Sequence, residues 1–125
     1  MAARIVLIDD EDSLRAALRR YLERTGYEVA EAQEGAAGLK LLREAPAALV
    51  ITDIFMEGRE GLETIRAMRR EFPKVKIIAM SGGGTDSPLD PLTMAQQLGA
   101  SRVLNKPFSL EEMGKAVEDL VGRGG

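Results

Sequence analysis

The sequence predicts an α/β fold: a parallel β-sheet with helices on both of its faces. Short apolar runs alternate with segments of helical periodicity along the whole chain of 125 residues. Three of the runs are almost continuously apolar, which is typical of strands buried on both faces of a parallel sheet. Five strands in strict alternation with five helices, joined by right-handed crossovers, place helices on both sides of the sheet. The expected strands cover residues 4–8, 28–32, 48–52, 75–80 and 102–105.

The first and last helices have the clearest signals. Apolar residues recur at i, i+3, i+4, i+7 and i+8 from residue 14 to residue 22, and Gly26 follows as a C-terminal stop. Residues 110–121 have a similar pattern, and Ser109 and Glu112 have the spacing of a capping box at its start. Both segments are therefore expected to be amphipathic helices.

The three helices between them have weaker signals. Apolar residues at 39–42 indicate a second helix that ends near Pro46, and those at 62–72 indicate a third helix that Pro73 ends. A stretch rich in Gly and Pro follows the fourth strand and is typical of a loop. This loop delays the fourth helix to about residues 91–98.

The composition excludes several classes of protein. The net charge is −3 and the pI is about 5.1, whereas a nucleic-acid surface needs clustered Lys and Arg, so we expect no direct contact with nucleic acid. Cysteine is absent, which excludes a disulfide framework, a thiolate nucleophile and a zinc–thiolate site. No stretch approaches the roughly 20 apolar residues of a membrane-spanning helix. We therefore expect one globular domain, located in the cytoplasm and independent of membranes.

Chemically active side chains stand at the ends of four of the expected strands. Asp9 and Asp10 follow the first strand, Asp53 follows the third, Ser81 the fourth and Lys106 the fifth. The carboxyl ends of parallel strands meet at one edge of the sheet, where α/β folds place their sites. Neighbouring carboxylates repel each other, and a hard divalent cation with oxygen ligands offsets that repulsion. Together with an ammonium and a hydroxyl group, such a site can hold a phosphoryl group, with one carboxylate as the nucleophile.

Each of these residues, taken alone, has a simpler interpretation. Acids that precede a helix often cap it, and an Asp at the end of a strand is often a turn residue. Ser81 lies in a Ser-Gly-Gly stretch that is typical of a loop, and Lys106 fits a solvated side chain. The joint pattern favours the chemical interpretation, because four strand ends all carry the residue types that this chemistry needs.

Several motifs agree with those of one family. They are Ile8-Asp9-Asp10-Glu11, Thr52-Asp53-Ile54-Phe55-Met56 with Gly61, Met80-Ser81-Gly82, Leu98-Gly99-Ala100, and Asn105-Lys106-Pro107-Phe108. With these motifs at these spacings, essentially the whole chain resembles the receiver domain of two-component response regulators. The resemblance implies the flavodoxin-like doubly wound sheet, with strand order 2-1-3-4-5. It also implies a single receiver domain over residues 1–125, with no output domain in this chain.

The resemblance implies a magnesium site at the edge of the sheet. Asp10 and Asp53 would bind Mg²⁺ directly, and Asp9 would act through a water molecule. The backbone carbonyl of Phe55 would complete the ligands that the protein supplies. An all-oxygen set of this kind agrees with the general preference of Mg²⁺.

The resemblance also assigns roles in phosphoryl transfer. Asp53 would be the phosphoacceptor, and Lys106 would pair with Asp53 at rest and with the phosphoryl group afterwards. Ser81 would turn toward the phosphoryl group and draw the following loop with it. The peptide bond between Lys106 and Pro107 is cis in the family.

Partners follow from the same resemblance. A sensor histidine kinase or a histidine phosphotransfer protein would supply the phosphoryl group, because this chain contains no His and cannot be its own histidine kinase. The chain would be a signalling domain that catalyses only its own phosphorylation and dephosphorylation. Phosphorylation would switch a face made of the fourth helix, fifth strand and fifth helix. This face would bind a downstream effector protein, couple to an output domain or form a homodimer.

The sequence departs from the family where a receiver reports its state. Val103 replaces the usual Tyr or Phe, so inward rotation of an aromatic ring cannot report phosphorylation here. Glu57 replaces the Pro that usually follows the phosphoacceptor by four positions. The loop after the fourth strand is longer than usual, and we hypothesise that switching is an order–disorder change of residues 82–91.

Three other functions agree less well with these residues. A pseudo-receiver would dock a partner constitutively without taking up phosphate, and the complete set of polar residues argues against it. A metal-dependent phosphatase would normally have a second acid two positions after its nucleophile, where this chain has Phe55. A flavodoxin-like cofactor protein would need a phosphate-binding loop after the first strand, where this chain has acids.

Overall fold

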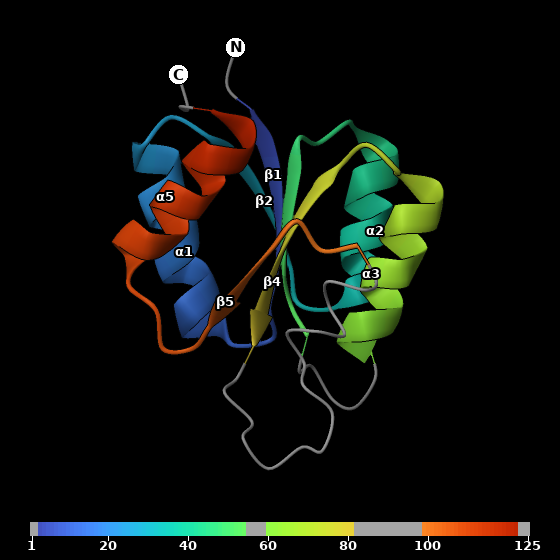
Figure 1. Ribbon diagram of the computed structural model, residues 1–125, viewed down its shortest axis with the longest axis horizontal. Helices are drawn as coiled ribbons and strands as arrows, with labels where there is room; N and C mark the ends of the chain where they lie inside the picture. Colours follow the sequence, from blue (N-terminus) through green and yellow to red (C-terminus); the bar gives the residue numbers. More distant parts are fainter. Residues whose placement is uncertain (1–2, 55–59, 82–98, 123–125) are drawn as a thin grey trace.

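Five parallel strands form one sheet in the order β2-β1-β3-β4-β5 (Figure 1). The computed structural model describes residues 3–54, 60–81 and 99–122. The predicted strands and their order are confirmed. The strands are β1 (Arg4–Ile8), β2 (Glu28–Ala32), β3 (Leu49–Asp53), β4 (Lys76–Ser81) and β5 (Arg102–Asn105).

Helices lie on both faces of this sheet, as the alternating pattern predicts. Figure 1 shows α1 and α5 together on one side of the sheet and α2 and α3 on the other. The described residues contain four helices, and the predicted fourth helix near residues 91–98 lies outside them. The helices are α1 (Asp12–Arg24), α2 (Gly35–Glu44), α3 (Glu60–Glu71) and α5 (Leu110–Val121).

Alternate side chains of the central strands supply a separate core on each face. In β1, Ile5 and Leu7 pack with α1 and α5, whereas Val6 and Ile8 pack on the side of α2 and α3. Successive strand residues point to opposite faces, so a continuous apolar run serves both cores. All four side chains are fully buried, which contributes roughly 1.5–3 kcal/mol for each.

The helix ends follow the predicted signals. Gly26 has φ +101°, a conformation that suits glycine, and it lies two residues after the end of α1. The helix α2 ends before Pro46, and α3 ends before Pro73. At the start of α5, the predicted capping box is formed: the Ser109 hydroxyl accepts from the Glu112 N–H, and the Glu112 carboxylate accepts from the Ser109 N–H.

The third and fourth strands begin and end one residue later than the sequence pattern indicated. Asp53 pairs with Met80, and Ser81 pairs with Asn105, so both polar residues belong to the sheet ladder. The N–H of Ile54 continues this ladder by donating to the carbonyl of Met80 at 3.0 Å. Asp53 and Ser81 are therefore the last residues of rigid strands rather than the first residues of loops.

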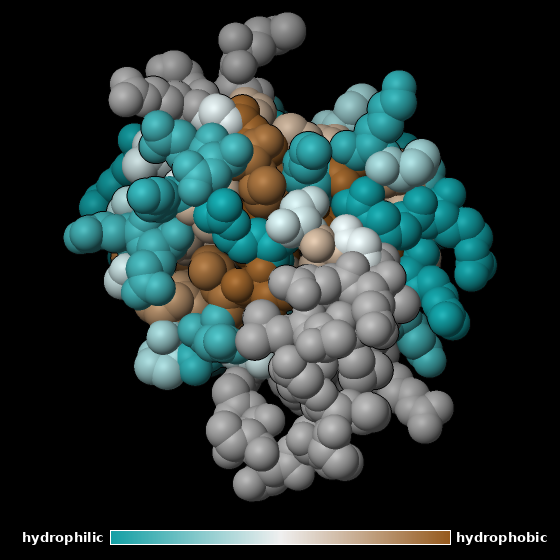
Figure 2. Space-filling view, in the orientation of Figure 1, coloured by the Kyte–Doolittle hydropathy of each residue, from teal (hydrophilic) through white to brown (hydrophobic). Residues whose placement is uncertain are grey.

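The strand β5 forms one edge of the sheet and is its least buried strand. Its first three residues are half-buried, and Asn105 is exposed. Figure 2 shows apolar surface at the front of the molecule, where β5 lies in Figure 1, while the flanking helices present mostly hydrophilic surface. Val103 packs partly against the core on the side of α2 and α3. None of the helices among the described residues has the length and apolar character needed to cross a membrane.

Candidate functional site

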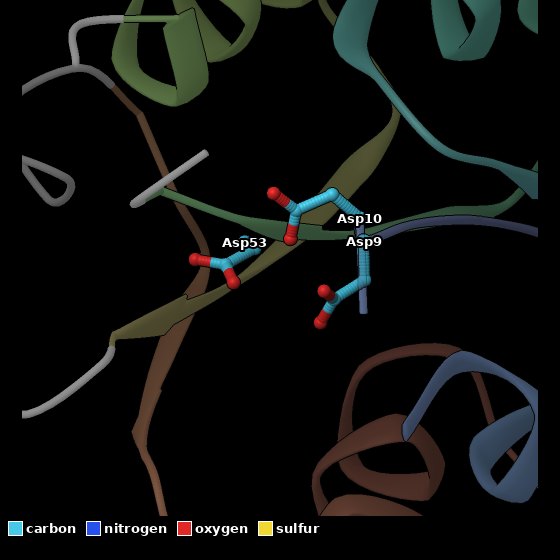
Figure 3. A group of neighbouring side chains, drawn as sticks. All are labelled: Asp9, Asp10 and Asp53. Atoms are coloured by element: carbon cyan, nitrogen blue, oxygen red, sulfur yellow. The ribbon is translucent and has the colours of Figure 1, made fainter. Parts of the chain in front are cut away.

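Three carboxylates meet at the carboxyl edge of the sheet. Asp9 and Asp10 come directly after β1, and Asp53 ends β3, so the sheet itself sets their separation. One carboxylate oxygen from each lies within 4.8 Å of the others, and Figure 3 shows the three groups side by side. Asp9 and Asp53 are buried, whereas Asp10 is exposed. The site is thus open to solvent on the side of Asp10.

The ammonium group of Lys106 bridges the two buried acids. Its Nζ donates to Oδ2 of Asp53 at 2.8 Å and to Oδ2 of Asp9 at 3.2 Å. The other oxygen of Asp9, Oδ1, accepts from the N–H of Glu11 at 2.8 Å, at the start of α1. The interpretation of Asp9 as a helix-end residue is therefore partly realised, but this contact uses only one of its two oxygens.

Burial and charge shift the pKa values of two of these groups. Burial raises the pKa of Asp9, and this effect exceeds the lowering by the Glu11 N–H and by Lys106. For Lys106, burial acts to lower the pKa, but the hydrogen bond and attraction from Asp53, with those from Asp9, raise it above its ordinary value. Lys106 therefore keeps its proton at neutral pH, and the pair of buried acids faces a permanent positive charge.

Ser81 and Lys106 are joined through the backbone. The Lys106 N–H donates to the Ser81 carbonyl at 2.7 Å, which continues the pairing of β4 with β5. Ser81 is buried, and Lys106 retains 21% of its side-chain exposure. The peptide bond between Lys106 and Pro107 is cis, as the resemblance implies. Ser81 and Lys106 thus lie next to each other at the carboxyl ends of two adjacent strands.

The charges at this edge do not balance. When all are ionised, three carboxylates and one ammonium leave 3 − 1 = 2 negative charges. The donor atoms are carboxylate oxygens, which are the ligands that hard divalent cations prefer. The residues present therefore fit a Mg²⁺ ion in both charge and donor type.

The structure brings together most of the residues that the sequence predicts for the site. Asp9, Asp10 and Asp53 meet in one cluster, and Lys106 contacts two of them. The resemblance implies that Lys106 pairs with Asp53, which it does, and its bond to Asp9 is an addition. The backbone carbonyl of Phe55 lies outside the described residues, as do Glu57 and the loop 82–91.

Arg15 was not singled out from the sequence. Its guanidinium contacts one residue of the acid cluster: it donates to the backbone carbonyl of Asp9 at 2.6 Å. The signal was present: Arg15 lies three and seven positions before Leu18 and Leu22, the two buried residues of α1. A cation on the buried stripe of an amphipathic helix needs a partner, and that requirement could have identified it.

Comparison with known proteins agrees with this geometry. The family model described as the response regulator receiver domain matches residues 5–118. The chain belongs to the response regulator receiver domains. Receiver domains are signalling domains of two-component systems that bind Mg²⁺ through a cluster of acids, which Asp9, Asp10 and Asp53 form here.

Solved structures of other receivers have the same fold. A receiver domain protein from Clostridium thermocellum is 29% identical, with a TM-score of 0.85 over 95% of this chain and 94% of that chain. The chemotaxis protein CheY4 of Vibrio cholerae is 25% identical, with a TM-score of 0.86 over 97% of this receiver and 100% of that chain. NtrX of Brucella abortus is 25% identical with a TM-score of 0.88, and this receiver covers 27% of that longer chain.

Proposed function

We propose that this receiver accepts a phosphoryl group on Asp53 from the phosphohistidine of a sensor histidine kinase or a histidine phosphotransfer protein. The environment of the Asp53 carboxylate is the main support for this proposal. It lies 2.8 Å from the ammonium of Lys106 and forms a cluster with the carboxylates of Asp9 and Asp10. One acid is thus held at a rigid strand end, next to groups that can bind a phosphoryl group and a cation.

The proposed step is a displacement at phosphorus. A carboxylate oxygen of Asp53 attacks the phosphorus atom, and an O–P bond forms as the P–N bond of phosphohistidine breaks. The departing imidazole nitrogen takes a proton, and the product on Asp53 is an acyl phosphate. Asp53 is buried at the end of β3, so the sheet fixes the direction from which it attacks.

Asp9, Asp10 and Asp53 would hold Mg²⁺, with the Phe55 carbonyl as a further proposed ligand. When bound, the ion supplies positive charge that neutralises the phosphoryl oxygens. The carboxylates of Asp9, Asp10 and Asp53 would surround that ion. The buried carboxylate of Asp9 is itself held in place by hydrogen bonds from Lys106 and from the Glu11 N–H.

Lys106 and Ser81 would stabilise the phosphorylated state. The raised pKa of Lys106, which results from Asp53 and Asp9 against the opposing effect of burial, keeps it an ammonium that can follow the charge to the phosphoryl oxygens. The Ser81 hydroxyl would donate a hydrogen bond to the same oxygens. Ser81 ends β4 and Lys106 directly follows β5. Movement of these two residues would therefore reach the face that includes β5 and α5.

The output of this receiver would be a change in protein contacts. A phosphorylated Asp53 is larger and more negative than the carboxylate, and this difference would bias the proposed partner-binding face. The recipient would be a downstream effector protein or an output domain, as in regulators longer than this chain. A homodimer through the fourth helix, β5 and α5 is a further form of the same output.

Intact-protein mass spectrometry tests the proposal. The parent protein and Asp53→Asn are incubated with Mg²⁺ and acetyl phosphate, with Asp119→Asn on the exposed face of α5 as a matched control. We expect one phosphoryl group on the parent and on Asp119→Asn, and none on Asp53→Asn. No phosphoryl group on a folded parent that binds Mg²⁺ would contradict the proposal and favour a pseudo-receiver.

A further inference from the structure

The guanidinium group of Arg15 makes three hydrogen bonds to three separate segments of the chain. Its Nη1 donates to the backbone carbonyl of Asp9 at 2.6 Å, and its Nε donates to Oε1 of Glu31 in β2 at 3.1 Å. Its Nη2 donates to Oδ1 of Asp12 at 2.8 Å, in the first turn of α1. The Arg15 side chain is only 12% exposed, so its bonds to Asp9 and Glu31 are partly shielded from water, whereas its bond to Asp12 lies at the surface, where the Asp12 side chain is 77% exposed.

The carbonyl that Arg15 binds belongs to the peptide group that joins Asp9 to Asp10. Asp9 has further restraints, because its N–H donates to Ala32 and its carboxylate contacts Glu11 and Lys106. Among the described residues, no hydrogen bond or ion pair holds the exposed carboxylate of Asp10. The direction of Asp10 therefore depends on the plane of the peptide that precedes it, and Arg15 is the side chain that fixes this plane.

Arg15 is itself anchored to the sheet. Glu31 pairs in register with Leu7 of β1, so its backbone is part of the ladder between β1 and β2. The hydrogen bonds to Asp12 and Glu31 raise the pKa of Arg15 despite burial, which acts most strongly in the opposite direction. A planar guanidinium can place three donors at fixed angles, whereas a lysine ammonium at the end of a flexible stem cannot reproduce this fork.

We propose that Arg15 is a positioning residue for the metal site: it locks the Asp9–Asp10 peptide and so directs the Asp10 carboxylate toward the bound cation. This inference rests on the proposed function, because it assumes that the three acids bind Mg²⁺. It adds a residue outside the acid cluster that controls the affinity of that cluster.

Electrostatics and positioning predict opposite results for the loss of Arg15. A positive charge next to a cation site opposes cation binding, so removal of the charge alone would strengthen Mg²⁺ binding. Loss of the positioning contact would instead let Asp10 turn away and would weaken binding. Removal of groups that orient metal ligands typically weakens binding by about 10–100-fold. Because Asp10 is one of three acids, we expect a value near the low end of this range.

Isothermal titration with Mg²⁺ tests the inference on folded, unphosphorylated protein. The variants are Arg15→Gln, which removes the fork, and Arg15→Lys, which keeps the charge but not the fork. The matched control is Arg19→Gln on the same helix, since Arg19 forms ion pairs with Glu23 and with the same Glu31. Far-UV circular dichroism at the titration temperature verifies that each variant is folded.

We expect Kd for Mg²⁺ to rise about tenfold in Arg15→Gln and at least as much in Arg15→Lys, which loses the fork but keeps the charge that opposes the cation, and to stay within twofold in Arg19→Gln. Unchanged or tighter binding by Arg15→Gln would overturn the inference and leave the proposed function intact. Equal weakening in Arg19→Gln would overturn it as well, because that residue does not anchor the peptide. A parent protein without Mg²⁺ affinity would overturn the proposed function and this inference with it.

A second variant covers the case in which Arg15→Gln does not fold. Glu31→Gln keeps the shape of the side chain and leaves Arg15 in place, but it removes the charge that anchors the guanidinium. We expect Kd for Mg²⁺ to rise about two- to threefold, a smaller effect than loss of Arg15 itself. Parent-like Mg²⁺ binding by folded Glu31→Gln would count against the inference.

Discussion

Charged side chains are held in different ways at the carboxyl edge of the sheet, where the strands end, and at its amino edge, where the strands begin. At the carboxyl edge, Lys106 faces Asp9 and Asp53, and two negative charges remain unbalanced when all the acids of the cluster, Asp10 included, are ionised. At the amino edge, Arg4 and Arg69 bind backbone carbonyls near helix ends. The first arrangement leaves net charge that a cation can neutralise, while the second uses its charge to hold the fold together.

The amino edge follows from the polarity of helices. The helices of an alternating α/β chain end at this edge, and helix C-termini carry partial negative charge and unpaired carbonyls. Arg4 donates to the carbonyls of Leu41 at 3.1 Å and Ala45 at 2.6 Å, at the end of α2. Arg69 donates to the carbonyls of Pro73 and Val75, just after α3.

A hollow of about 360 Å³ also opens at the amino edge, between the ends of α2 and α3. Its walls are largely apolar and include Leu42, Phe72 and Val75. It lies at the opposite edge from the acid cluster, and none of the three acids lines it. The unbalanced charge, rather than this hollow, identifies the candidate site.

Removal of Lys106 should have the largest effect on stability. In Lys106→Met, Asp9 and Asp53 lose their shared counter-charge, and the free energy of unfolding should fall by about 2–3 kcal/mol. This is somewhat less than for a fully buried pair, because Lys106 is partly exposed. Urea denaturation with and without Mg²⁺ measures the change, and Mg²⁺ should restore more stability to the variant than to the parent.

Lys115→Met serves as the matched control for this measurement, because Lys115 is an exposed lysine of α5. It should unfold as the parent does, at every Mg²⁺ concentration. If Lys106→Met were as stable as the parent in the absence of Mg²⁺, the carboxyl edge would not depend on its ammonium group, and the contrast between the edges would fail.

Removal of Arg69 should destabilise the protein without affecting its response to Mg²⁺. Arg69→Met loses the bonds to the carbonyls of Pro73 and Val75, which should lower the free energy of unfolding by about 1–2 kcal/mol. The loss is moderated because burial already lowers the pKa of Arg69, so its charge is unfavourable where it lies. The increase in stability on adding Mg²⁺ should equal that of the parent. A changed increase would link the two edges and would refute their independence.

The sequence was sufficient to predict the carboxyl edge because its signals are local. Each apolar run shows where a strand ends, and a parallel sheet then brings Asp53, Ser81 and Lys106 to one edge. The exact strand ends were wrong by one residue, because the ladder between Asp53 and Met80 depends on pairing and not on local composition. The identity of each site residue was unaffected, since a shift of one residue leaves it at the same edge.

The contacts that join distant segments could not be predicted in this way. The fork of Arg15 requires Glu31 to lie beside it, and that depends on how α1 packs across β2. The bond from Lys106 to Asp9 requires β1 and the end of β5 to converge around β3 and β4. A single sequence indicates which residues are charged and where the strands end, but not which donor is in reach of which acceptor.

Asp9, the most deeply buried acid at the carboxyl edge, should reduce the stability of the folded protein at neutral pH. Burial raises the pKa of Asp9 above its ordinary value of 3.8, so the folded protein binds a proton more readily than the unfolded chain. Stability therefore falls as the pH rises through the interval between these two pKa values, and the loss is complete above the folded-state value. Asp9→Asn removes this loss and keeps an oxygen for the Glu11 N–H.

We expect Asp9→Asn to be about 1 kcal/mol more stable than the parent at pH 7 without Mg²⁺. The gain should disappear as the pH falls toward 3.8, where the unfolded chain also binds the proton. Thermal unfolding between pH 4 and pH 8 in the presence of a chelator measures both. A variant that is less stable than the parent at pH 7, or a gain in stability that does not vary with pH, would contradict this prediction.

The smallest effect should come from the ion pair between Arg43 and Glu71 at the amino edge. Its two hydrogen bonds, at 2.7 and 2.6 Å, are as short as any contact of Lys106. These bonds raise the pKa of Arg43 and lower that of Glu71, but both side chains are largely exposed, and water and salt screen the attraction. In Arg43→Met at physiological salt, we expect no measurable change in unfolding by urea. A loss as large as that of Arg69→Met would mean that short distance, rather than burial, determines the strength of ion pairs in this receiver.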